Sequence, residues 1–359
     1  MRRFLIYSLA ASALSVPSAA LAHDDETAIR ADGHAPIGVM GDHMHKAGEF
    51  MISYRFMHMD MEGNRIGTDS VSPETIATTV PNRFFGRPMQ PPTLRVVPTE
   101  MSMNMHMVGA MYAPTDWLTL MAMGSYVTKD MDHITFMGPA GTTRLGTFTT
   151  NSSGFGDTKL GGLVRLYEDE THHLHANIGF SLPTGSITET DRVLAPTGMR
   201  PTLRLPYAMQ LGSGTFDLLP GLTYTGQSDT FGWGAQATGT IRLGENDEGY
   251  SLGNGANLTA WASYMPEPWV SFSGRVAYSH LGSIDGIDPM IVAPVQTADP
   301  DNYGGDTVTL LAGVNLAGQT GLLRGHRLAL EVGLPVYRNL NGPQMETDWT
   351  ITLGYQFAF

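Results

Sequence analysis

The sequence contains no cysteine among its 359 residues. A chain without cysteine forms no disulfide, holds no metal through thiolates and has no cysteine nucleophile. After residue 22 it also lacks any run of eighteen apolar residues, the length that a transmembrane helix needs. Basic residues are few, and the net charge of −13 argues against nucleic acid as a partner.

What the chain does contain is alternation, most clearly in its last eleven residues, 349–359. Aromatic and aliphatic side chains occupy every second position there, and small or polar ones occupy the positions between. This pattern is typical of the last strand of a bacterial outer-membrane β-barrel, whose apolar face contacts lipid while the other face lines the lumen. The mean hydropathy of −0.09 agrees, because only alternate residues of such a barrel meet lipid.

The N-terminus predicts export. Residues 1–22 combine two arginines, a short apolar run and small residues at Ala20 and Ala22, which is the pattern of a cleaved signal peptide. We therefore expect a Met/His-containing periplasmic segment over 23–47 and one barrel over 48–359. The expected location is the outer membrane of a Gram-negative cell.

Twelve segments of strand length alternate in this way, which predicts an all-β, closed antiparallel transmembrane β-barrel of about twelve strands, with fourteen as the alternative. The segments are 48–61, 101–113, 116–129, 155–167, 171–183, 215–227, 230–243, 253–265, 268–281, 305–317, 326–337 and 347–359.

The lengths of the connections support an even number of strands, as bacterial barrels have. With the C-terminus in the periplasm, the tight connections fall on the periplasmic side and the long ones fall outside, as in bacterial barrels. The long connections are 62–100, 130–154, 184–214, 244–252, 282–304 and 338–346. We assign 203–212 to the third outer loop, because Pro206 lacks the N–H that a central strand position needs. Loops 62–100 and 184–214 either plug the lumen or leave it open.

Methionine is abundant, with 22 residues, and it concentrates on the first three predicted strands. If the aromatic and aliphatic faces of these strands contact lipid, the residues between them face the lumen. We predict that they line a substrate pathway. This set is Met57, Met59, Met61, Met103, Met105, Met107, Met111, Met121 and Met123, together with Arg55 and Lys129.

Two interpretations of these methionines stay open. They are either flexible packing residues in an irregular lumen, or weak, exchangeable ligands for a soft cation such as Cu(I) or Ag(I). The candidate metal ligands on the second interpretation are His43, Met44, His45, His58, Met59, Met103, Met105 and Met121.

Four segments, 38–67, 111–121, 154–161 and 210–217, resemble a family of outer-membrane transporters related to the barrel proteins of the meta-pathway of phenol degradation. The resemblance covers most of the chain after the signal peptide. It implies a channel-like barrel that passes hydrophobic or aromatic compounds in some relatives, and a role in metal tolerance for the Met/His-rich branch.

The expected function is therefore an outer-membrane channel for small solutes, either hydrophobic compounds or soft metal ions. The alternative is a copper-tolerance barrel that sequesters or senses metal without conducting it. No enzyme activity or bound cofactor is expected beyond transient Cu(I) or Ag(I), and the partners are outer-membrane lipid and the solute. Only His280 and Ser283 suggest a catalytic pair, and their spacing places them on opposite strand faces.

Overall fold

The computed structural model describes residues 29–359, so the predicted signal peptide, 1–22, and the start of segment 23–47 lie outside the described residues. The strands are β1 (Phe50–Gly67), β2 (Asp69–Val71), β3 (Val96–Thr115), β4 (Leu118–Phe136), β5 (Arg144–Phe155), β6 (Thr158–Glu168), β7 (His172–Leu182), β8 (Thr190–Arg192), β9 (Thr202–Arg204), β10 (Asp217–Gln227), β11 (Phe231–Arg242), β12 (Tyr250–Ser251), β13 (Gly255–Glu267), β14 (Val270–Leu281), β15 (Asp285–Gly286), β16 (Gly305–Ala317) and β17 (His326–Ala358). The helices are α1 (Pro73–Thr79) and the 3₁₀ turns η1 (Tyr207–Met209), η2 (Gln296–Ala298), η3 (Pro300–Asn302) and η4 (Gly321–Leu323).

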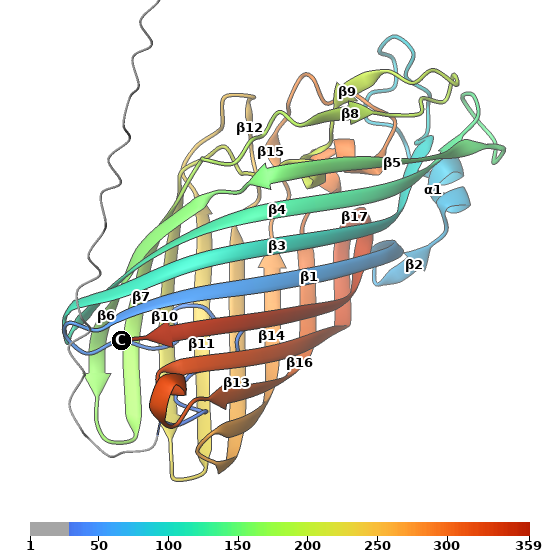
Figure 1. The fold of residues 1–359 in the computed structure, drawn as a ribbon. Coiled ribbons are helices and arrows are strands. Elements are labelled where there is room, and N and C mark those ends of the chain that lie inside the picture. Colours follow the sequence, from blue (N-terminus) through green and yellow to red (C-terminus); the bar gives the residue numbers. More distant parts are fainter. Residues whose placement is uncertain (1–28) are drawn as a thin grey trace, which may run out of the picture.

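Within residues 29–359, eleven strands form a closed antiparallel ring in the order β17, β16, β14, β13, β11, β10, β7, β6, β4, β3, β1. Pairing of β1 with β17 closes the ring, from Met51 opposite Ala358 onward. Two further strands extend it, since β2 pairs with β1 and β5 pairs with β4. The predicted closed all-β barrel is confirmed (Figure 1).

Each of the twelve predicted segments overlaps a strand of this ring, and the last two are the two halves of β17. Residues 327–340 pair with β16, and residues 340–358 pair with β1. The halves contact each other at the end away from the bend, where His326 Nδ1 lies 2.7 Å from the Tyr355 hydroxyl. Short turns gather at one end of the ring and long connections gather at the other, as predicted (Figure 1). The predicted long connection 338–346 is wrong, because these residues belong to strand β17.

The two faces of the wall differ as lipid and lumen require. Large apolar side chains such as Leu258, Phe272 and Leu310 are about half exposed on the outside, where a bilayer would cover them. Polar side chains such as Thr223 and Ser271 are buried inside. No helix in the described part of the chain is both long and apolar enough to cross a membrane.

The predicted outer loop 130–154 is wrong, because most of it is strand. β4 continues to Phe136, and β5 returns beside it from Arg144. The break between β5 and β6 falls at residues 156–157, where the Asp157 carboxylate accepts backbone N–H groups of Gly185 and Ser213 at 2.9 and 2.8 Å. These contacts hold the loop after β7 against the wall.

A packed apolar cluster covers the loop end of the ring. It joins several long connections, and Tyr250 and Ala298 at its centre are fully buried. A second cluster packs α1 against the extended ends of β3 and β4, with Ile76 and Phe136 at 0% exposure. The connections at this end are therefore an ordered part of the fold, and they position a segment that enters the lumen.

Candidate functional site

Residues 29–49, which we call the N-terminal plug, lie inside the short-turn end of the barrel. Arg327 Nη2 donates to the Ala35 carbonyl at 2.6 Å, and the Gly38 N–H donates to Glu331 Oε2 at 3.1 Å. A side chain at Gly38 would collide with that carboxylate, so glycine allows the close approach. The sequence predicted a periplasmic segment over 23–47, and its described part occupies the lumen.

The first residues of the plug bond to the short turns. The Arg30 guanidinium donates to the carbonyl of Ser228 at 2.7 Å, and Gln319 Nε2 donates to the carbonyl of Ile29 at 2.7 Å. The first hydrogen bond reaches the β10–β11 turn, and the second reaches the β16–β17 connection. The plug is thus held on several sides of the ring.

Residues 205–213, which we call the inserted loop, enter from the opposite end, as assigned from the sequence. Lys129 Nζ donates to the carbonyls of Ala208 and Gln210 at 2.8 and 2.6 Å. Ser152 Oγ donates to the Met209 carbonyl at 2.7 Å. These barrel side chains satisfy backbone groups that would otherwise be buried without partners, so they fix the loop inside the lumen.

A cavity of about 560 Å³ lies between the N-terminal plug and the inserted loop. Thioethers from three adjacent strands form one of its walls: Met57, Met105, Met107 and Met123. Met40 of the plug joins them from below. The predicted pathway residues Arg55 and Lys129 also line this cavity.

Charged side chains in the cavity wall are unequal in number, with four basic and two acidic ones. They are Arg55, Lys129, Lys159 and Arg242 against Asp157 and Asp217. Arg242 forms an ion pair with Asp217, and Asp157 is already engaged with backbone N–H groups. The remaining charge around the cavity is positive, which disfavours a free cation in a low-dielectric lumen.

Methionines continue above and below the cavity. At the plug end, Met44 and Met121 pack against the buried side chains of Met51 and Met111. At the loop end, the methionine cluster consists of Met61, Met101, Met131, Met209 and Met345, packed with Leu205. Thioethers therefore follow the lumen through both closed ends, and Met209 and Met345 extend the set that the sequence predicted.

Two predicted methionines lie between the cavity and the loop-end cluster. Met59 and Met103 are directly opposite each other on β1 and β3, and the Thr347 hydroxyl lies 3.7 Å from Met59 Sδ. His58 does not join them. It contacts Trp349 on the outer face, and its Nδ1 lies 2.8 Å from Asn104 Oδ1, so the structure separates it from the other candidate ligands.

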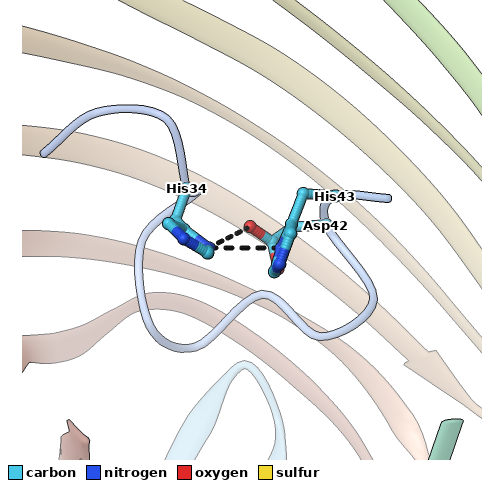
Figure 2. Close-up of side chains that lie close together, drawn as sticks. All are labelled: His34, Asp42 and His43. Carbon is cyan, nitrogen blue, oxygen red and sulfur yellow. Dashed lines mark hydrogen bonds and ion pairs between the residues drawn. The ribbon is translucent and has the colours of Figure 1, made fainter. Parts of the chain in front are cut away.

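The histidines of the plug gather at the short-turn end. His34 Nδ1 lies 3.2 Å from His43 Nδ1, and Asp42 Oδ1 lies 3.0 Å from the same His43 atom (Figure 2). Burial lowers the pKa of His34 well below its ordinary value, so its imidazole is neutral near pH 7. Burial raises the pKa of Asp42, but the neighbouring histidines outweigh it and hold that pKa well below its usual range.

Sequence reasoning named His43 and His45 and missed His34 and Asp42. The run 42–45 marks one arm of this cluster, but nothing in the sequence shows that the plug folds back to bring residue 34 against it. The catalytic alternative gains no support from geometry, since His280 pairs with Asp306 at 2.8 Å. No hydrogen bond within residues 29–359 joins His280 to Ser283.

Comparison with solved structures finds chains with a similar β-barrel fold. An outer membrane channel from Pseudomonas putida F1 matches with a TM-score of 0.56 at 14% identity, covering 89% of this chain and 99% of that one. A Pseudomonas aeruginosa FadL homologue matches with a TM-score of 0.47 at 10% identity, over 92% and 98%. The CymD monoaromatic hydrocarbon channel matches with a TM-score of 0.40 at 9% identity, over 88% and 89%.

No protein-family model and no curated protein matches the chain. The first of these structural matches therefore supports the predicted outer-membrane barrel fold at the level of architecture. None of the comparisons tests membership of the family that the four sequence segments resemble.

Proposed function

We propose that this protein is an outer-membrane channel for small apolar or amphipathic solutes. The observation that carries the proposal is the methionine-lined cavity between the N-terminal plug and the inserted loop. Its volume of about 560 Å³ lies within the range of small-molecule sites, roughly 300–1,000 Å³. Thioether side chains are flexible and polarisable, so they adapt to apolar solutes of different shape.

The membrane orientation follows from the loops. Bacterial barrels place short turns in the periplasm and long loops outside, which puts the plug on the periplasmic side. A solute that reaches the cavity from outside leaves it only when the plug or the inserted loop shifts. The excess of basic side chains around the cavity favours neutral solutes over free cations.

A second candidate solute is a soft cation such as Cu(I) or Ag(I). The observation that favours it is the continuity of the methionines, because cross-strand pairs such as Met57–Met105 and Met59–Met103 bring thioethers onto neighbouring strands. Neighbouring thioethers without thiolates form weak sites from which an ion can leave. We rank it second because the cavity wall is net basic.

One set of variants tests both candidates. Met123→Trp fills the cavity, and we expect it to slow uptake of a labelled phenol by cells whose lipopolysaccharide leaflet restricts free diffusion. Leu310→Trp adds the same ring on the outer face and serves as the control. A seven-residue exchange of Met57, Met59, Met103, Met105, Met107, Met121 and Met123 to leucine keeps volume and apolar character, so it leaves phenol uptake near the native level.

The outcomes separate the solutes. Equal uptake by the native protein and a correctly assembled Met123→Trp variant would contradict the solute channel. The leucine exchange changes silver or copper accumulation only if the thioethers pass soft cations. An unchanged metal response with the folded leucine variant removes the second candidate.

A further inference from the structure

We propose that His34, Asp42 and His43 form a binding site for a divalent transition-metal ion of the Zn²⁺ and Cu²⁺ class at the short-turn end of the lumen (Figure 2). The site is separate from the methionine-lined cavity and goes beyond the proposed channel function. It uses nitrogen and oxygen donors, whereas the candidate pathway for soft ions uses sulfur.

The spacing of the donor atoms fits one ion. All three ligand atoms lie within 4.8 Å of one another. The separations are 3.2 Å between the two Nδ1 atoms, 3.0 Å from His43 Nδ1 to Asp42 Oδ1 and 4.0 Å from His34 Nδ1 to Asp42 Oδ2. Bonds of about 2.0–2.1 Å in a tetrahedral site separate ligands by roughly 3.3 Å, so an ion needs only small side-chain shifts.

The buried imidazoles beside the site are incompletely satisfied by the protein. Within residues 29–359, the buried atoms His43 Nε2 and His45 Nε2 have no hydrogen-bond partner. His45 is 5% exposed, and its ring centroid lies 4.8 Å from that of His43. Buried nitrogens without partners are costly, and both lie beside the three ligand atoms, where the water ligands of a bound ion would supply hydrogen-bond partners.

Access comes from a cavity of about 520 Å³ that the three residues line together with His45 and His175. This cavity lies at the short-turn end, because Arg30 and Gln227 also line it. It leaves room beside the ion for water or a fourth ligand. A site with three protein ligands and one open position is a common zinc arrangement.

The ligands are held by the plug and by the barrel wall. Asp42 Oδ2 accepts the Ala35 N–H at 2.8 Å, which ties the two arms of the plug together. The Ala35 carbonyl in turn accepts a hydrogen bond from Arg327 of β17. Outer contacts of this kind orient the donors of metal sites. Two imidazoles with one carboxylate suit Zn²⁺ or Cu²⁺ better than Ca²⁺ or Mg²⁺, which prefer oxygen ligands.

Zn²⁺ binding by the full-length protein tests the proposal. The protein is purified in detergent, stripped with a chelator and titrated with Zn²⁺ by calorimetry, and we expect one ion per chain. The His34→Gln/His43→Gln variant should lose more than the roughly 100-fold in affinity that removal of an outer-shell partner costs. His280→Gln is the matched control, since His280 lies on β14 at the other end of the barrel wall.

Three results would overturn the site. These are no Zn²⁺ binding by the native protein, native affinity in the double glutamine variant, and loss of Zn²⁺ binding in the seven-residue leucine exchange, whose methionines are not zinc ligands. If the double variant fails to assemble, the single His34→Gln change is measured instead, because His34 is partly exposed and its loss disturbs less packing. Phenol uptake is assayed without Zn²⁺. A failure of the metal site therefore leaves the test of the solute channel unaffected, and the reverse also holds.

Discussion

Glu331 is 1% exposed and accepts two hydrogen bonds from the Arg275 guanidinium, at 2.8 and 2.7 Å. It also accepts the Gly38 N–H of the plug. A buried carboxylate that is bidentately paired and further hydrogen-bonded has its charge fully compensated. This one side chain therefore connects β14, β17 and the N-terminal plug.

Glu331→Leu should lower the free energy of unfolding by about 3–5 kcal/mol, because it leaves the Arg275 charge buried without its partner. The double change Arg275→Met/Glu331→Leu removes both charges and should cost less than the single one. Urea unfolding of the barrel in detergent measures both. A double variant that is less stable than Glu331→Leu would contradict this account of the pair.

The N-terminal plug is the element whose position depends most on contacts with distant strands. Its carbonyls and N–H groups bond to barrel side chains such as His175 and Gln236, at 2.9 Å in both cases. Residues 29–47 precede β1 and belong to no strand of the ring, so their removal leaves the ladder hydrogen bonds of the barrel intact. The backbone bonds of Ala113 on β3 are with Gly48 and Glu49, which remain.

Deleting residues 29–47 should therefore raise single-channel conductance in planar bilayers while the barrel still assembles. The matched control is the native protein reconstituted in the same lipid. The inserted loop remains in the deletion variant, so the increase should be partial. Conductance equal to that of the native channel would show that the inserted loop alone closes the lumen.

Period-two alternation predicted the ring because each strand of a closed barrel has one face outward and the other toward the lumen. The same reasoning missed β5, since its sequence around Thr147, Thr149 and Asn151 is polar on both faces. It also wrongly included His58 among the candidate metal ligands. The register of β1, β3 and β17 places this side chain on the outer face. The plug was not predictable, because its irregular backbone has no period and its partners are far away in sequence.

The last residue adds one more backbone pair to the seam that closes the barrel. The Phe50 N–H donates to the Phe359 carbonyl at 2.8 Å, and the Phe359 N–H donates to the Phe50 carbonyl at 2.9 Å. The Phe359 ring also contacts the ring of Phe357 at 5.2 Å on the outer face. The backbone and the side chain of Phe359 therefore both contribute contacts to the seam between β1 and β17.

Removing Phe359 should reduce the amount of assembled barrel in the outer-membrane fraction, because the seam loses two hydrogen bonds and its outermost aromatic side chain. Heat-modifiable migration on gels measures the assembled fraction. Phe359→Leu keeps the backbone bonds and separates the two contributions. Native amounts of the truncated protein in the membrane would refute the importance of the terminal residue for assembly.

The seam joins β1 to β17, the last strand, and it pairs residues as distant in sequence as Met51 and Ala358. Contacts of such sequence separation form slowly, because the intervening chain must first be ordered. Until β17 arrives, β1 presents an unpaired edge that is prone to wrong pairing. The plug is made before β1, yet it ends inside a ring that closes last. It must therefore be held within the curving sheet while the barrel assembles, or enter through the short-turn end after closure.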